Sequence, residues 1–175
     1  HAPIVIDPFD EDVLYTAAEV VFRSKDEGMS WEVISPVLTK DDESKQQAGG
    51  SPSSLETSGQ EAYNTIHRRV ASKVGQGIFW TGSDDGLVHV TRNGGQSWEN
   101  VTPPDMPEDT DVYELEASPH DAGTVYVAAS RYRTANEFQP YLWKSTNYGM
   151  TWTNLSKNFP QTEITRTIRE DTVRK

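Results

Sequence analysis

The sequence has no cysteine, few basic residues and no long apolar run. Without cysteine, disulfides, thiolate metal sites and cysteine nucleophiles are all excluded. The 27 acidic residues outnumber the 16 basic ones, and the formal charge of -11 would repel the phosphates of nucleic acid, so we expect no nucleic-acid partner. No apolar segment approaches the roughly 18 residues needed to span a bilayer, and we therefore expect no membrane insertion.

The residues that are abundant favour short strands joined by turns. The chain has five Trp, seven Tyr, twelve Gly and ten Pro in 175 residues. Aromatic residues are typical of strands, whereas Gly and Pro are typical of the turns between them. The length suits one domain with a core of its own. The composition therefore predicts an all-β domain.

One eight-residue motif occurs three times, at 24–31, 91–98 and 145–152. Its form is hydroxyl, any residue, Asp or Asn, any residue, Gly, any residue, hydroxyl, Trp. The residues that define it are Ser24, Asp26, Gly28 and Trp31, then Thr91, Asn93, Gly95 and Trp98, and then Ser145, Asn147, Gly149 and Trp152. Recurrence at this spacing indicates a repeat architecture.

Each copy of the motif follows a short alternating segment, at 20–23, 87–90 and 141–144. Asp or Asn accepts backbone N–H bonds across a turn, Gly takes a positive φ, and Trp covers apolar surface on the outgoing strand. The motif thus predicts a strand, a tight turn and a second strand. We interpret Asp26, Asn93 and Asn147 as turn-forming residues rather than metal ligands or catalytic groups.

A second recurring unit lies upstream of the hairpins, in the segments 7–17 and 118–128. Together the two units predict an all-β fold, a β-propeller sector of about three four-stranded antiparallel blades plus the first strand of a fourth. The expected blades are residues 2–37, 62–103 and 111–156. An exposed polar loop is expected at 38–61, and the first strand of the fourth blade at 162–170, so we expect the chain to be a fragment.

The three hairpins resemble the Asp-box, or bacterial neuraminidase repeat, and the whole chain is similar to bacterial sortilin-like proteins, often labelled glycosyl hydrolases. Beyond the hairpins the likeness rests on residues 34–39, 82–91, 116–124 and 168–171. The resemblance implies a propeller with more blades than this chain holds. It also implies a secreted, periplasmic or cell-surface parent, although the chain starts with no signal-like segment.

Alternating strands place the motif hairpins on one face of the blades and the other turns on the opposite face, where we expect any ligand. Asp84 and Asp85 lie in one of those turns and can act as acid and base or hold a cation, but Asp-Asp-Gly is also an ordinary turn sequence. The loop 131–140 offers Tyr132, Arg133 and Phe138 for sugar or peptide recognition, or for simple packing.

The first strand of each blade lines the propeller channel and adds further candidates. Glu114 and Glu116 lie on the same side of their strand because strand side chains alternate. Beside Arg68 and Arg166 they can form a carboxylate pair for glycoside hydrolysis or a ligand clamp, or only ion pairs between blades. The low-priority catalytic candidates are therefore Asp84, Asp85, Glu114 and Glu116, and the expected ligand-binding residues are Arg68, Tyr132, Arg133, Phe138 and Arg166.

The sequence supports two main hypotheses about function and one weaker one. The favoured hypothesis is a binding or scaffold module for a polysaccharide or protein ligand; the alternative is part of a propeller glycoside hydrolase with carboxylate acid/base catalysis. A sialidase is disfavoured because Phe22-Arg23 runs into Ser24 of the first motif. A photosystem-assembly-type propeller lacks a basic docking surface here.

No residue spacing indicates a metal or a cofactor, and we expect none. The four histidines, His1, His67, His89 and His120, do not have the spacing of metal ligands. Exposed strand edges and apolar blade flanks favour association between chains, so we also expect this fragment to form a dimer.

Overall fold

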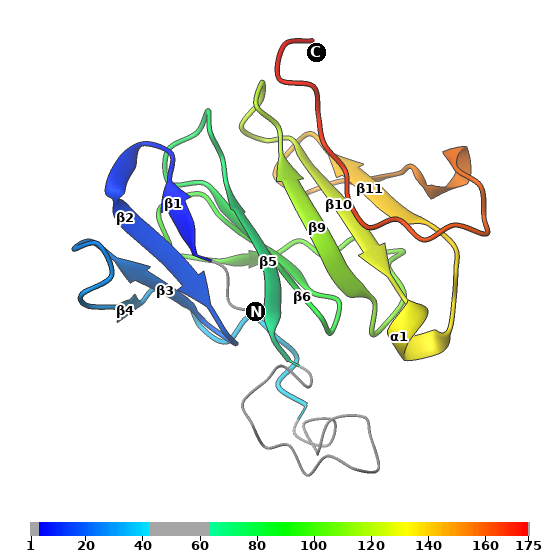
Figure 1. Ribbon diagram of the computed structural model, residues 1–175, viewed down its shortest axis with the longest axis horizontal. Coiled ribbons are helices and arrows are strands. Elements are labelled where there is room, and N and C mark those ends of the chain that lie inside the picture. The colour runs from blue at the N-terminus through cyan, green and yellow to red at the C-terminus, as the bar shows by residue number, and fades with distance from the viewer. Residues whose placement is uncertain (1–3, 43–63, 175) are drawn as a thin grey trace.

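The computed structural model describes residues 4–42 and 64–174, and it is nearly all β (Figure 1). Twelve strands form three four-stranded antiparallel sheets, each a simple meander. Blade A consists of β1 (Val5–Asp7), β2 (Asp10–Ala17), β3 (Val21–Ser24) and β4 (Glu32–Val33). Blade B consists of β5 (Ile66–Ala71), β6 (Phe79–Ser83), β7 (Val88–Thr91) and β8 (Glu99–Asn100). Blade C consists of β9 (Asp111–Ala117), β10 (Val125–Ser130), β11 (Tyr141–Ser145) and β12 (Thr153–Asn154).

This arrangement confirms the predicted all-β class and its three four-stranded blades. The described residues also include two short helices, α1 (Tyr132–Ala135) between β10 and β11, and the 3-10 turn η2 (Ser156–Asn158) after β12. Residues 162–170 make no strand pairing with the described residues, and the C-terminal segment passes in front of blade C (Figure 1). Most of the predicted polar loop 38–61 lies outside the described residues.

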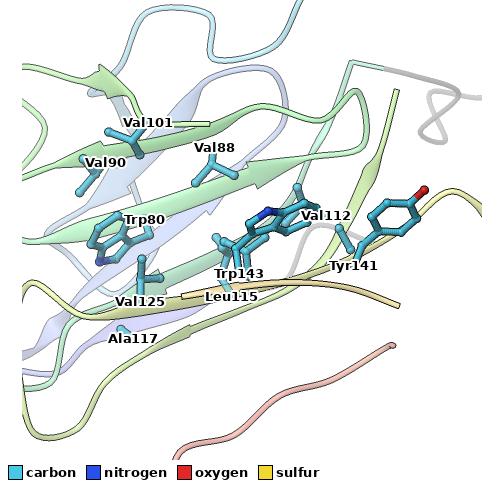
Figure 2. Close-up of a cluster of buried hydrophobic side chains, with 12 residues drawn as sticks. Trp80, Val88, Val90, Val101, Val112, Leu115, Ala117, Val125, Tyr141 and Trp143 are labelled. Carbon is cyan, nitrogen blue, oxygen red and sulfur yellow. The ribbon is translucent and has the colours of Figure 1, made fainter. Parts of the chain in front are cut away.

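The larger core lies between blades B and C (Figure 2). Trp80 of β6 and Trp143 of β11 are both almost fully buried there, among valines of β7, β9 and β10. Burying one such aliphatic side chain contributes about 1.5–3 kcal/mol. Gly82 permits the close approach of β6 to β9, because a Cβ at this position would lie 2.4 Å from Cγ1 of Val112.

The smaller core joins blade A to blade B. The rings of Tyr15 and Phe79 have centroids 4.8 Å apart, and the indole of Trp98 meets Phe79 edge-on at 6.2 Å. Ile66 and Leu38 are buried beside them. Each blade therefore packs on the next through side chains that alternate along the strands.

The three motif hairpins, residues 24–31, 91–98 and 145–152, have the same internal hydrogen bonds. The hydroxyl oxygen at the first position accepts the N–H of the fifth residue at 2.8, 2.9 and 2.9 Å in the three copies. The side-chain oxygen at the third position accepts the N–H of the seventh residue, also at 2.8, 2.9 and 2.9 Å. The glycines have φ of +91°, +92° and +81°, which only glycine adopts without strain.

Two of the motif tryptophans join neighbouring blades. The indole N–H of Trp98 donates to the carbonyl of Ile34 at 2.9 Å, and that of Trp152 donates to the carbonyl of Val101 at 2.8 Å. Trp31 of blade A instead donates to Gly28 of its own hairpin at 3.1 Å. The motif residues thus close the turns, and in blades B and C they also fasten the blade to the one before it.

Candidate functional site

The turns opposite the motif hairpins form a surface that we call the loop face, made of residues 38–42, 64–67, 83–87, 107–111 and 131–141. Hydrogen bonds join these segments across blades. The N–H of Asp84 donates to the carbonyl of Thr65 at 3.0 Å, and the hydroxyl of Thr134 donates to the carbonyl of Asp109 at 2.8 Å. The Lys40 ammonium lies 3.3 Å from the Asp109 carboxylate. The loop face is therefore a connected surface that spans all three blades.

Asp85, one of the two predicted carboxylates in the β6–β7 turn, is completely buried. One of its oxygens accepts the N–H of Lys40 at 2.6 Å, and the other accepts the hydroxyl of Ser83. These contacts hold the segment that leaves blade A against the turn of blade B. Asp85 stabilises the loop face from beneath.

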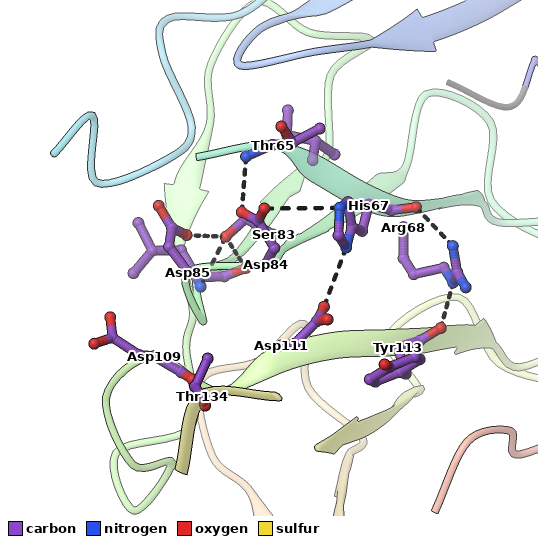
Figure 3. Close-up of polar contacts among 12 residues, drawn as sticks. Thr65, His67, Arg68, Ser83, Asp84, Asp85, Asp109, Asp111, Tyr113 and Thr134 are labelled. Carbon is purple, nitrogen blue, oxygen red and sulfur yellow. Dashed lines mark hydrogen bonds and ion pairs between the residues drawn. The ribbon is translucent and has the colours of Figure 1, made fainter. Parts of the chain in front are cut away.

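Asp84 takes part in a cluster with two residues from other strands (Figure 3). One of its oxygens accepts the N–H of Thr65 at 2.8 Å, and the other lies 3.7 Å from Nε2 of His67. Nδ1 of the same imidazole lies 3.1 Å from Oδ1 of Asp111 on β9. Burial raises the pKa of the Asp84 carboxyl. One imidazole thus lies between two carboxylates in this Asp84–His67–Asp111 cluster.

Glu114 and Glu116 of β9 lie apart from this cluster and share one guanidinium. Nη2 of Arg169 is 3.3 Å from Glu114, and Nη1 is 3.7 Å from Glu116. Burial raises the pKa of Glu116, while Arg169 opposes this effect. The two carboxylates thus lie on one side of β9 and pair with the C-terminal segment.

The predicted arginines have different surroundings. Arg68 donates through Nε to the carbonyl of Tyr113 and through Nη1 to the carbonyl of His67 at 3.0 Å, so it bridges β5 and β9 (Figure 3). Arg133 on α1 and Arg166 in the C-terminal segment are both exposed. The structure therefore does not gather the three arginines into one group.

Tyr132 and Phe138 form an exposed aromatic pair at the two ends of the loop around α1. Their side chains are 43% and 49% exposed, and their ring centroids are 5.2 Å apart at an angle of 60°. Asn136 ends α1 with φ of +55°, which turns the chain back toward the helix. The pair is held together on the loop face.

A polar network supports this aromatic pair. The Glu137 carboxylate accepts Nη1 of Arg131 at 2.6 Å and also accepts the hydroxyl of Tyr141. Gln139 donates to the Tyr141 oxygen at 2.5 Å. Hydrogen bonding lowers the pKa of Glu137, so the carboxylate stays ionised. The loop therefore offers two rings next to fixed hydrogen-bonding groups.

Sequence reasoning missed His67 and Asp111 as members of a cluster. His67 is the extra residue of a β-bulge between Ile66 and Arg68, and such bulges re-aim side chains. Among residues 4–42 and 64–174, no three His, Asp or Glu side chains are grouped so that they could hold a metal ion. Within the same residues, no helix is long and apolar enough to cross a membrane.

A scan against protein-family models finds no match for this sequence, and no curated protein matches it. Among solved structures, an ancestral GH74 enzyme is similar to 94% of this chain, with a TM-score of 0.63 and 18% identity. The GH74 enzyme of Niastella koreensis is similar to 86% of it, with a TM-score of 0.59 and 16% identity. YCF48 from Cyanidioschyzon merolae is similar to 87%, with a TM-score of 0.55 and 14% identity.

At these identities the likeness shows the fold alone, which is that of β-propeller blades. The chain spans only 19% and 22% of the two GH74 enzymes and 38% of YCF48. The comparisons therefore support a propeller, glycosyl-hydrolase-like fold.

Proposed function

We propose that this chain is the ligand-binding part of an exported propeller protein and that its loop face binds neutral polysaccharide. The observation that carries the proposal is the exposed Tyr132–Phe138 pair next to the Glu137 network. Aromatic rings cover the apolar C–H faces of sugars, while carboxylates and amides accept and donate hydrogen bonds to sugar hydroxyls. The net charge of -11 favours a neutral polymer over an anionic one.

The likeness of the motif hairpins to Asp-boxes, and of the chain to sortilin-like proteins, belongs to the same proposal. It assigns the parent to the periplasm, the cell surface or the secreted fraction, where polysaccharides are accessible. A protein ligand on the same loop face is the competing form of the proposal. The two forms differ in whether purified polysaccharide alone retards the protein.

Affinity electrophoresis in gels that contain neutral polysaccharides tests the proposal. We expect retardation of the 175-residue chain, and loss of retardation when Tyr132 and Phe138 are both replaced by Ala. The matched control is Phe9→Ala, because Phe9 is similarly exposed, at 46%, on the β1–β2 turn away from the loop face. Unretarded migration in every neutral polysaccharide would refute a polysaccharide ligand.

Hydrolysis of a glycosidic bond is the second candidate function, and the Asp84–His67–Asp111 cluster favours it. Burial raises the pKa of the Asp84 carboxyl, which favours its protonated form relative to an ordinary Asp and suits a proton donor to a leaving oxygen. Release of reducing sugar, abolished by Asp84→Asn and retained by Asp26→Asn in a motif hairpin, would support catalysis. Binding without sugar release would exclude it for this chain.

A further inference from the structure

One row of side chains on blade B is polar although it lies in the interface between two blades. The strand register pairs Arg69 with Thr81 and Thr81 with His89, so these three residues lie side by side across β5, β6 and β7. They share a side of the sheet with Ala71 and Phe79, which belong to the core between blades A and B. The three residues are 7%, 1% and 9% exposed. We call them the buried polar row.

Blade C is apolar at the equivalent positions. His89 and Trp143 each stand two residues before the first residue of a motif hairpin. The register pairs Trp143 with Val127 and Val127 with Leu115, and all three belong to the core between blades B and C. A Leu, a Val and a Trp of blade C therefore have the positions that an Arg, a Thr and a His have in blade B. Departures of this kind from a local pattern are expected at functional sites.

The buried polar row holds hydrogen-bond donors without acceptors. Nη1 of Arg69 donates to the carbonyl of Ile66 at 3.5 Å, which is the outer limit of a hydrogen bond. Nε and Nη2 of Arg69, and Nδ1 of His89, are buried and have no hydrogen-bond partner among residues 4–42 and 64–174. Burial lowers the pKa of His89 to about 4, so the imidazole is neutral at pH 7 and can carry its hydrogen on Nδ1. Thr81 adds a hydroxyl between the two.

The charge of Arg69 has no counter-charge in the part of the chain that the structure describes. None of the ion pairs found there includes Arg69. Burial, and then the like charge of Arg68, lower the pKa of Arg69 to about 10, so the guanidinium is still protonated at pH 7. Buried charges in proteins are nearly always paired, because an ion that leaves water needs a partner in its place. The row therefore calls for a negative charge.

The surface opposite the row is apolar. The N–H of Ile66, at the start of β5, donates to the carbonyl of Ala18 at 2.8 Å, which places the β2–β3 turn of blade A beside blade B. Ala17 and Val21 flank that turn, and both are buried in the core between the two blades. Leu38 is buried in the same core. A ligand in this interface thus meets donors from blade B and apolar side chains from blade A.

We propose that the buried polar row binds one small monovalent anion, of the size of chloride, between blades A and B. Arg69 supplies the positive charge and two N–H donors, and Thr81 and His89 supply a hydroxyl and an imidazole N–H. One negative charge balances the single charge of the row, whereas phosphate or sulfate would leave an excess of buried negative charge. The anion is a structural ligand that joins the two blades, and it is separate from the ligand of the loop face.

Thermal unfolding at constant ionic strength tests the site. The chain is dialysed exhaustively into sodium methanesulfonate, and chloride then replaces this bulkier monovalent anion in steps. We expect the melting temperature of the wild-type chain to rise with chloride, as it does for any ligand that binds only the folded chain. Arg69→Met should melt above the wild-type chain without chloride, because it lacks the unpaired charge, and should not respond to chloride.

The matched control is Arg68→Met, which should keep the full chloride response because Arg68 bonds the carbonyl of Tyr113 on the side of blade C. A wild-type chain that responds to chloride no more than Arg69→Met does would overturn the proposal. Thr81→Val is a second variant, and it introduces the residue that blade C has at this position. The chloride concentration that gives half of the response should rise at least about fivefold in Thr81→Val, because one donor is lost.

Crystals grown in bromide instead of chloride show the occupant directly. We expect an anomalous scattering peak in the interface of blades A and B, beside Nε of Arg69. An ordered water in that place, without anomalous signal, would overturn the proposal even if chloride raises the melting temperature by another route.

Discussion

The indole N–H of Trp152 lies 2.8 Å from the carbonyl oxygen of Val101, which belongs to the neighbouring blade. The same hairpin presses Gly149 against the Val101 side chain. One short motif thus forms a turn within blade C and fixes the position of blade C on blade B. The motif therefore has two structural roles, in the turn and between the blades, and both are roles in folding.

Gly149→Ala should destabilise the fold more than Gly28→Ala. Both residues have a positive φ, so the backbone strain is similar in the two variants. Only the Cβ at position 149 meets the neighbouring blade, at 2.5 Å from Cβ of Val101. We expect the free energy of unfolding to fall by about 1–3 kcal/mol more for Gly149→Ala, as overpacking does. Urea unfolding measures it, and equal losses would refute the interlocking role.

Asp85→Ala should lower the free energy of unfolding by about 3 kcal/mol, because it removes the carboxylate that accepts the N–H of Lys40 and the buried hydroxyl of Ser83. Asp171→Ala is a suitable control, since Asp171 also accepts two hydrogen bonds, from the N–H groups of Val173 and Arg174, but is exposed. The free energy of unfolding should fall less for this control than for Asp85→Ala. A negligible loss for Asp85→Ala would show that the loop face does not depend on this carboxylate.

Arg69→Met should raise the melting temperature. Arg69 is 7% exposed, its Nε and Nη2 have no hydrogen-bond partner among residues 4–42 and 64–174, and burial lowers its pKa to about 10. Replacing a buried unpaired charge by an apolar side chain of similar length removes a desolvation cost. The neighbouring Arg68→Met is the control and should lower the melting temperature, because Arg68 bonds two carbonyls. A lower melting temperature for Arg69→Met in chloride-free buffer would contradict this prediction.

His89 should make stability depend on pH. Burial lowers its pKa to about 4, so between about pH 6.5 and pH 4 the unfolded chain binds a proton that the folded chain does not. The free energy of unfolding should therefore fall as the pH falls through this window, by up to about 3 kcal/mol from this group. His89→Phe should remove that part, since Phe22 has the equivalent position in blade A. If the free energy of unfolding has the same pH dependence in the wild-type chain and in His89→Phe, the role of His89 is contradicted.

The sequence allowed the blades to be predicted because their signals are local. Within each hairpin, the hydroxyl, the Asp or Asn and the Gly bond one another over a few residues, as Thr91 and Gly95 do at 2.9 Å. Such contacts depend on turn chemistry and not on distant parts of the chain. The class and number of blades follow from counting these turns.

The candidate site could be predicted only in part, because its contacts depend on register between blades. The sequence indicates Asp84 as a candidate in the turn 83–86, but the other members of its cluster, His67 and Asp111, come from two other strands. A bulge in β5 directs His67 toward Asp84 and Asp111, and no local signal in the sequence indicates that bulge. The short helix α1 inside the loop 131–140 was likewise not predicted, although it positions Tyr132 beside Phe138.

The most direct test of the proposed loop-face function is a backbone amide NMR titration of the chain with a neutral oligosaccharide that retards it in gels. We predict chemical-shift changes in residues 131–141 and in the adjacent turn 83–87. Residues 24–31, 91–98 and 145–152 of the motif hairpins should be unchanged. Shift changes confined to the motif hairpins would contradict the assignment of ligand binding to the opposite face.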